Sequence, residues 1–241
     1  DAAARQARFQ RVNRSGEPYG RVNPCGQFPE IQRFCHDVGV SISQGFGQHP
    51  ALDGAMVHTE FRDGSGLCFH PHDLAAYRAH FGRDIPEDAI NRGGVPARRR
   101  GEFVPLNGIV ADDLPILDFY RWFWSKGDGW NELHSQVHRG LKTGTHPGFW
   151  TFFDPAMRVP PVWGSGGEVD VLSQWTYTYP DPLKIGLATD ELFAMAEGRS
   201  GQRVMKMTQL IWYRDQTAPN LSPIEEDRAA WERSEPGAKF I

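Results

Sequence analysis

The chain has 241 residues, of which 39% are hydrophobic and 12% aromatic, enough to fill the core of one domain spanning 1–241. Its formal net charge of −4 argues against a nucleic-acid or anionic-membrane partner, and no apolar run approaches the ~20 residues of a membrane span. Three widely spaced cysteines do not make a disulfide framework, and no signal peptide is visible, so we expect a soluble protein, either cytoplasmic or secreted.

The first half of the chain alternates helical and extended patterns. Residues 1–27 are predicted to be irregular because glycine and proline recur there. Apolar residues near helical spacing predict a helix over 28–46, and the short apolar run in 54–59 predicts a buried strand. A second helix is expected over 73–81, closed by Gly82, and a long loop excursion follows over about 82–114.

The second half continues the alternation. A long helical pattern covers 114–142, and Gly127-Asp128-Gly129 is expected to bend or interrupt it. The remaining elements are a strand over 149–153, a strand within 169–179, a helix over 189–198 with Thr189 as its N-cap, and a strand over 204–213.

Strands that alternate with helices predict a parallel sheet. We find about four core strands, whereas a closed (β/α)8 barrel needs eight. The chain is therefore expected to be either part of a TIM-barrel-like domain or an open α/β sheet. In the first case the other strands belong to a longer precursor or to a partner chain, which includes a homo-oligomer.

Polar side chains follow each predicted strand, and the carboxyl ends of parallel strands meet at one edge of the sheet. Carboxylates there suit acid–base work, arginine and glutamine suit hydroxyl groups, and aromatic rings suit the faces of sugars. The candidate acids are Glu60, Asp154 and Asp170, and the candidate substrate-binding residues are Arg62, Arg158, Trp175, Tyr177 and Gln209.

Each acid also has a structural interpretation. Glu60 could simply pair with Arg62 or Arg78, Asp154 could be a turn former before Pro155, and Asp170 could cap the glycine-rich loop before it.

The segment 68–73 (CFHPHD) contains four possible metal ligands. Its Cys-x-His-x-His spacing is not a standard structural-zinc pattern, and no distant fourth ligand is evident. A metal-dependent hydrolase using His58, Asp63, His70 and His72 is one alternative. We expect instead a loop that feeds the next helix, with no metal and no cofactor.

Three segments resemble the glycoside hydrolases of the large (β/α)8 clan, and in particular the family 42 β-galactosidases. The stretch 49–60 (HPALDGAMVHTE) resembles the approach to the strand that carries the family's acid/base glutamate. The stretch 67–86 resembles the insertion after that strand, where cysteine ligands precede a helix. The stretch 117–123 (LDFYRWF) resembles the start of the next helix.

The resemblance implies a glycosidase that acts on an oligo- or polysaccharide, with Glu60 as the general acid/base. The stretch 204–209 that matches the family's nucleophile strand has no carboxylate, so Asp154 or Asp170 would have to supply the second one. The same departure favours an alternative, a non-catalytic carbohydrate-binding or assembly protein on the same fold. In the segment 68–73, His70 and His72 stand where the family has further thiols as ligands.

Overall fold

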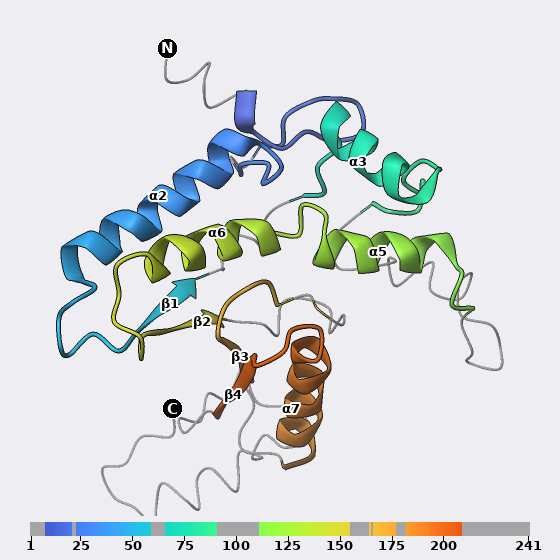
Figure 1. Ribbon diagram of the computed structural model, residues 1–241. Coiled ribbons are helices and arrows are strands. Elements are labelled where there is room, and N and C mark those ends of the chain that lie inside the picture. Colours follow the sequence, from blue (N-terminus) through green and yellow to red (C-terminus); the bar gives the residue numbers. More distant parts are fainter. Residues whose placement is uncertain are drawn as a thin grey trace, which may run out of the picture.

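The computed structural model describes residues 8–20, 23–58, 66–90, 111–154, 164, 166–176 and 182–208 (Figure 1). They form a mixed α/β structure with a four-stranded parallel sheet. The elements in chain order are α2 (Pro29–Phe46), β1 (Gly54–His58), α3 (Pro71–Phe81), α5 (Pro115–Ser125), α6 (Asn131–Lys142), β2 (Trp150–Asp154), β3 (Val171–Thr176), α7 (Pro182–Ala196) and β4 (Arg203–Thr208). None of the described helices is long and apolar enough to cross a membrane.

The strands pair in the order in which the chain makes them, β1-β2-β3-β4, and every pair is parallel. β1 and β2 are in register along their whole length, from Gly54 opposite Trp150 to His58 opposite Asp154. β3 and β4 are likewise in register as far as Thr176 opposite Thr208. All four strands therefore direct their carboxyl ends to one edge of the sheet.

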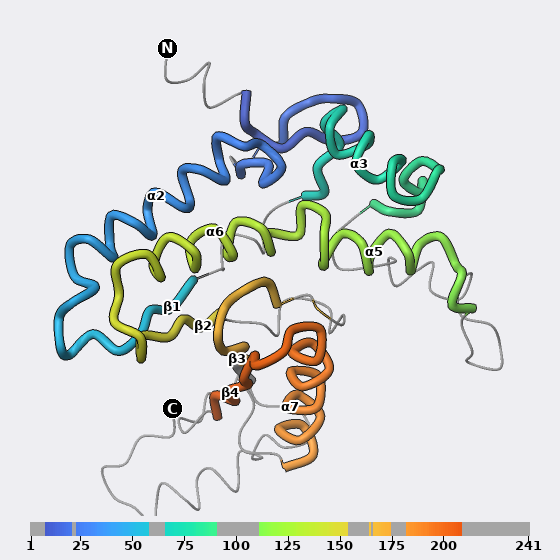
Figure 2. The backbone as a smooth tube through the Cα atoms, in the orientation of Figure 1, coloured from blue at the N-terminus to red at the C-terminus, as the bar shows by residue number. Residues whose placement is uncertain are grey.

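Helices α2 and α6 pack closely because glycines meet where they cross (Figure 2). A Cβ atom added to Gly39 would lie 2.4 Å from the carbonyl oxygen of Val137, and one added to Gly140 would lie 2.1 Å from that of His36. Only the hydrogen atom of a glycine fits in this space. The two helix backbones therefore approach each other more closely than larger residues would allow.

The core is unusually aromatic and is built from side chains of helices α3, α5 and α7 and of strands β1, β2 and β3. Six residues of α5 are buried, and Phe119 and Trp122 both meet the fully buried Tyr77 of α3 in edge-to-face contacts. Phe153 and Leu172, on neighbouring strands, are also completely buried. The aromatic residues of these segments therefore fill the core.

The structure confirms most of the predicted elements. The helices over 28–46 and 73–81 and the four strands are present, and Gly82 closes α3 in the left-handed conformation with φ of 67°. The long helical pattern is indeed interrupted, since α5 ends at Ser125 and α6 begins at Asn131. The predicted start of the last helix is wrong: α7 begins at Pro182, and Thr189 lies inside it.

The described part of the N-terminal segment has little regular structure, as expected. It folds back on itself through two isolated antiparallel bridges, Gln10 with Pro24 and Val12 with Pro18. The amide of Phe69 donates to the carbonyl oxygen of Val12 at 3.0 Å, which ties this segment to the chain before α3. Of the long excursion over 82–114, residues 91–110 lie outside the described part of the chain.

Candidate functional site

The sheet's carboxyl edge is where the sequence places an active site. Because His58 and Asp154 are register partners, the chain leaves β1 and β2 side by side at this edge. Asp154 is the last residue of β2, whereas Glu60 follows β1 in the sequence and lies outside the described residues. Neighbouring strands lie about 4.8 Å apart, so the ends of β1 and β2 are adjacent at this edge.

Most of the predicted site residues lie outside the described part of the chain. Asp154 is the last residue of β2 and Trp175 the fifth of β3, and only their positions in the strands are described. The others that lie outside the described residues are Glu60, Arg62, Arg158, Tyr177 and Gln209, together with the alternative metal ligand Asp63. Their roles stay predictions.

Asp170 has a different setting from the other two acids. It directly precedes β3, at the level of Thr151 and thus towards the amino ends of the strands. Its Oδ2 accepts the backbone N–H of Thr151 at 2.8 Å and lies 2.8 Å from Lys142 Nζ. Hydrogen bonds and the lysine charge lower the pKa of Asp170 despite its partial burial. This position favours a structural role over that of a catalytic acid.

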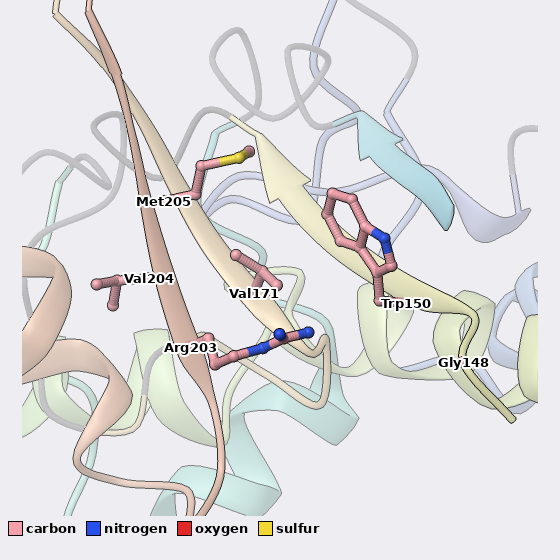
Figure 3. A pocket seen from close by; sticks show the side chains of 6 residues that line it. All are labelled: Gly148, Trp150, Val171, Arg203, Val204 and Met205. Atoms are coloured by element: carbon pink, nitrogen blue, oxygen red, sulfur yellow. The ribbon is translucent and has the colours of Figure 1, made fainter. Parts of the chain in front are cut away.

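An open pocket of about 310 Å³ lies at the opposite end of the sheet from the predicted site (Figure 3). Trp150, Val171 and Arg203, which line it, are the first residues of three neighbouring strands. Active sites of parallel barrels are built at the carboxyl ends of strands, so we do not assign this pocket to the predicted site.

A second group of reactive side chains lies at the junction of three chain segments. Cys25 comes from the N-terminal segment. Cys68 lies just before α3 and Asp73 lies in the first turn of α3, while Asp128 comes from the loop between α5 and α6. One ligand atom from each lies within 4.8 Å of all the others, and all four residues are buried. We call them the thiol–carboxylate cluster.

The loop that supplies Asp128 is a sharp turn. Trp130 has φ of 76°, the left-handed conformation that a residue with a side chain rarely adopts. The guanidinium of Arg11 lies over its ring, 5.6 Å from the centroid. The amide of Gly26, next to Cys25, donates to Asp128 Oδ1 at 2.8 Å. The turn thereby carries a carboxylate to a cysteine more than a hundred residues away in sequence.

Burial and mutual proximity shift the ionisation of the cluster. Burial raises the pKa of Asp73 to about 9 and that of Asp128 to about 7. A hydrogen bond between the two thiols lowers the pKa of Cys68 to about 5 and raises that of Cys25. Each of these four acidic groups, when ionised, disfavours the ionisation of the others, because the site is buried away from water. A bound cation would stabilise their ionised forms.

Arg11 balances only part of this charge. Its Nη2 lies 2.8 Å from Asp128 Oδ1, and both side chains are buried. Asp73 Oδ1 and Asp128 Oδ2 are buried with no hydrogen-bond partner. Buried carboxylate oxygens are normally paired, so these two, beside two thiols, are available to a cation.

Two histidines stand at the rim of the cluster. His72 Nε2 lies 3.2 Å from Cys25 Sγ and 3.3 Å from Asp73 Oδ2, within reach of a bound ion after a small shift. His70 Nε2 instead lies 2.8 Å from the carbonyl oxygen of Gln10 and is occupied there. Burial lowers the pKa of His72, which keeps its ring neutral, as a metal ligand must be.

Sequence reasoning identified Cys68 and Asp73 as possible ligands but missed Cys25 and Asp128. The sequence gives a weak signal for Asp128, which stands between two glycines, and for Cys25, which stands between a proline and a glycine. Both patterns are also typical of ordinary turns. Whether the chain binds a metal is not decided by the cluster, so the expectation of no metal stays a prediction.

Comparison with known proteins gives no match. No protein family, no curated protein and no solved structure matches the chain.

Proposed function

We propose that the thiol–carboxylate cluster binds one divalent transition-metal ion and that the ion holds three chain segments together. The observation that carries the proposal is the burial of two thiols and two carboxylates whose ligand atoms lie within 4.8 Å of one another. Two sulfur and two oxygen ligands suit the tetrahedral shell of zinc, and thiolates disfavour magnesium and calcium.

The role of the ion is structural rather than catalytic. Catalytic zinc sites keep one position open to water or substrate, whereas structural sites are closed by four protein ligands. All four cluster residues are buried, and they come from the N-terminal segment, the start of α3 and the α5–α6 loop. An ion bound by all four would fix these segments relative to one another.

The test is metal content and thermal stability of the purified chain. We expect one zinc ion per chain, a lower Tm after chelation, and recovery with zinc but not with magnesium. Cys68→Ser should weaken zinc binding more than tenfold, since even outer-shell changes have effects of about that size. Cys35→Ser is the matched control, because Cys35 is the third free cysteine and lies on α2 outside the cluster. Equal zinc binding by the two variants would refute the site.

The second candidate function is hydrolysis of glycosidic bonds at the carboxyl edge of the sheet, as the resemblance implies. It is favoured by one observation, the register of β1 and β2, which sets His58, two residues before Glu60 in the sequence, opposite Asp154. In this proposal the sheet is part of a (β/α)8 barrel. Glu60 protonates the leaving oxygen, and Asp154 acts as the second carboxylate, with Arg62, Arg158, Trp175, Tyr177 and Gln209 around the sugar.

Its test is turnover of aryl glycosides by Glu60→Gln. Loss of a general acid should lower kcat by about 10²–10⁴-fold while binding of the sugar persists. Glu197→Gln, at an exposed position directly after α7, controls for the change of charge. A wild-type chain that binds sugars without hydrolysing them would point to the non-catalytic carbohydrate-binding protein, and the absence of both binding and turnover would reject the proposal.

A further inference from the structure

The thiol–carboxylate cluster is buried on the side of each of its four members. Cys25, Cys68, Asp73 and Asp128 are between 0 and 6% exposed, and Arg11, which pairs with Asp128, is 1% exposed. Taking a charge out of water without ligands is very costly, so a divalent ion must keep ligands throughout its passage to this site. A buried metal site therefore needs an entry path along which the ion is handed inward.

His72 is a side chain that meets both the cluster and solvent. It directly precedes Asp73 in the first turn of α3. Its Nε2 lies 3.2 Å from Cys25 Sγ and 3.3 Å from Asp73 Oδ2, while the side chain is 37% exposed. An ion in solvent can therefore reach the imidazole, and from the imidazole it is one step from a thiol and a carboxylate of the cluster.

Neighbouring rings hold His72 in this position. Phe28 meets the imidazole edge to face with the ring centroids 4.7 Å apart, and His70 stacks on it at 5.1 Å. His70 is tied in turn to the carbonyl oxygen of Gln10, in the N-terminal segment that also supplies Cys25. Packing thus keeps the ring of a half-exposed residue beside the cluster.

The four cluster residues leave no place for His72 in the finished site. Two thiols and two carboxylates, whose ligand atoms lie within 4.8 Å of one another, already make up a tetrahedral shell. Asp73 Oδ1 and Asp128 Oδ2, the buried oxygens without a hydrogen-bond partner, lie within this group. A ligand that touches two of its members from outside is suited to hold an ion in passage and then to give it up.

We propose that His72 is the entry ligand of the metal site, binding a zinc ion at the rim and passing it to Cys25 and Asp73. The inference rests on the metal site proposed above and adds the route by which its ion is exchanged. Each new bond to the ion forms as an earlier ligand leaves, so the ion never crosses the buried region bare. A group that holds the ion only in passage changes the loading and release rates by the same factor, and the Kd stays the same.

The experiment compares the rates of zinc exchange with the affinity for zinc in the full chain. Zinc is loaded onto the metal-free chain and then withdrawn by an excess of a chromophoric chelator. His72→Gln keeps a polar side chain but replaces the imidazole by an amide, which is not among the usual ligands of zinc. Loading and release should both slow by about tenfold or more, the size of effect that groups next to a metal shell have, with the Kd unchanged. His80→Gln, at an exposed position of the same helix, is the matched control and should exchange zinc at the wild-type rates.

Circular dichroism shows whether each variant is folded, and His72→Asn replaces His72→Gln if that variant is not. Faster release from the variant would make His72 a lid or a lasting support of the ligands, and unchanged rates would place the entry path elsewhere. Either result overturns the proposal. A wild-type chain that takes up no zinc at equilibrium would instead refute the metal site itself, so the two failures are distinguished.

Discussion

At the scale of single residues, Arg11 holds the N-terminal segment to the rest of the molecule. Its side chain is 1% exposed and donates to the backbone carbonyls of Pro24, Gly66 and Asp128 at 2.9–3.0 Å. It also forms the buried ion pair with the Asp128 carboxylate. A planar guanidinium with five N–H donors can serve all these acceptors at once, which a lysine could not.

Arg11→Met should therefore destabilise the chain by about 3–5 kcal/mol, the usual effect of leaving one partner of a buried ion pair without the other. Urea unfolding measures the loss. Arg8→Met is the control, since Arg8 forms an exposed ion pair with Glu30 and should change stability by less than about 1 kcal/mol. Similar losses in the two variants would contradict the role given to Arg11.

At the scale of elements, the crossing of α2 and α6 depends on glycines that sequence periodicity does not reveal. The His36 carbonyl oxygen and the Val40 amide nitrogen lie 2.1 and 2.9 Å from the place that a Cβ on Gly140 would occupy. Both neighbours are backbone atoms of a helix, so they cannot move aside as a side chain can. Any larger residue would have to push the two helices apart.

Gly140→Ala is expected to lower the free energy of unfolding by about 1–3 kcal/mol through this clash, although alanine is the better helix former. Gly45→Ala, on α2 with no neighbouring atom within 4 Å, should instead stabilise the chain by about 0.5–1 kcal/mol. Thermal unfolding of the two variants gives the signs directly. A stabilised Gly140→Ala would show that the helices do not cross in this way.

The elements also show where sequence patterns suffice and where they do not. Apolar spacing predicted α2 and α3, and glycines mark where they end, with Gly47 after α2 and Gly82 after α3. It missed the start of α7 because Thr189 has the appearance of an N-cap. In the structure the Thr189 hydroxyl donates to the Ile185 carbonyl oxygen one turn earlier, at 2.7 Å. A hydroxyl satisfied inside a helix and one that caps it have the same sequence signature.

At the scale of the whole molecule, the alternation of strands and helices was enough to predict a parallel sheet, because parallel strands require crossover connections. The thiol–carboxylate cluster could not be predicted in the same way. Cys25, Cys68 and Asp128 are brought together by the N-terminal segment and by the turn at Trp130, whose φ of 76° no propensity favours. Local patterns determine elements, whereas this site is determined by how irregular segments pack.

The reach of Arg11 has a consequence for synthesis of the chain on the ribosome. Arg11 and Gly26 bind Asp128, which lies 117 and 102 residues further along the sequence. At about 5–20 residues per second, translation takes several seconds to proceed from this segment to its partner. Throughout that interval Cys25 lacks the carboxylate that lies beside it in the folded chain. The segment around Arg11 therefore reaches its native contacts only after Asp128 has left the ribosome.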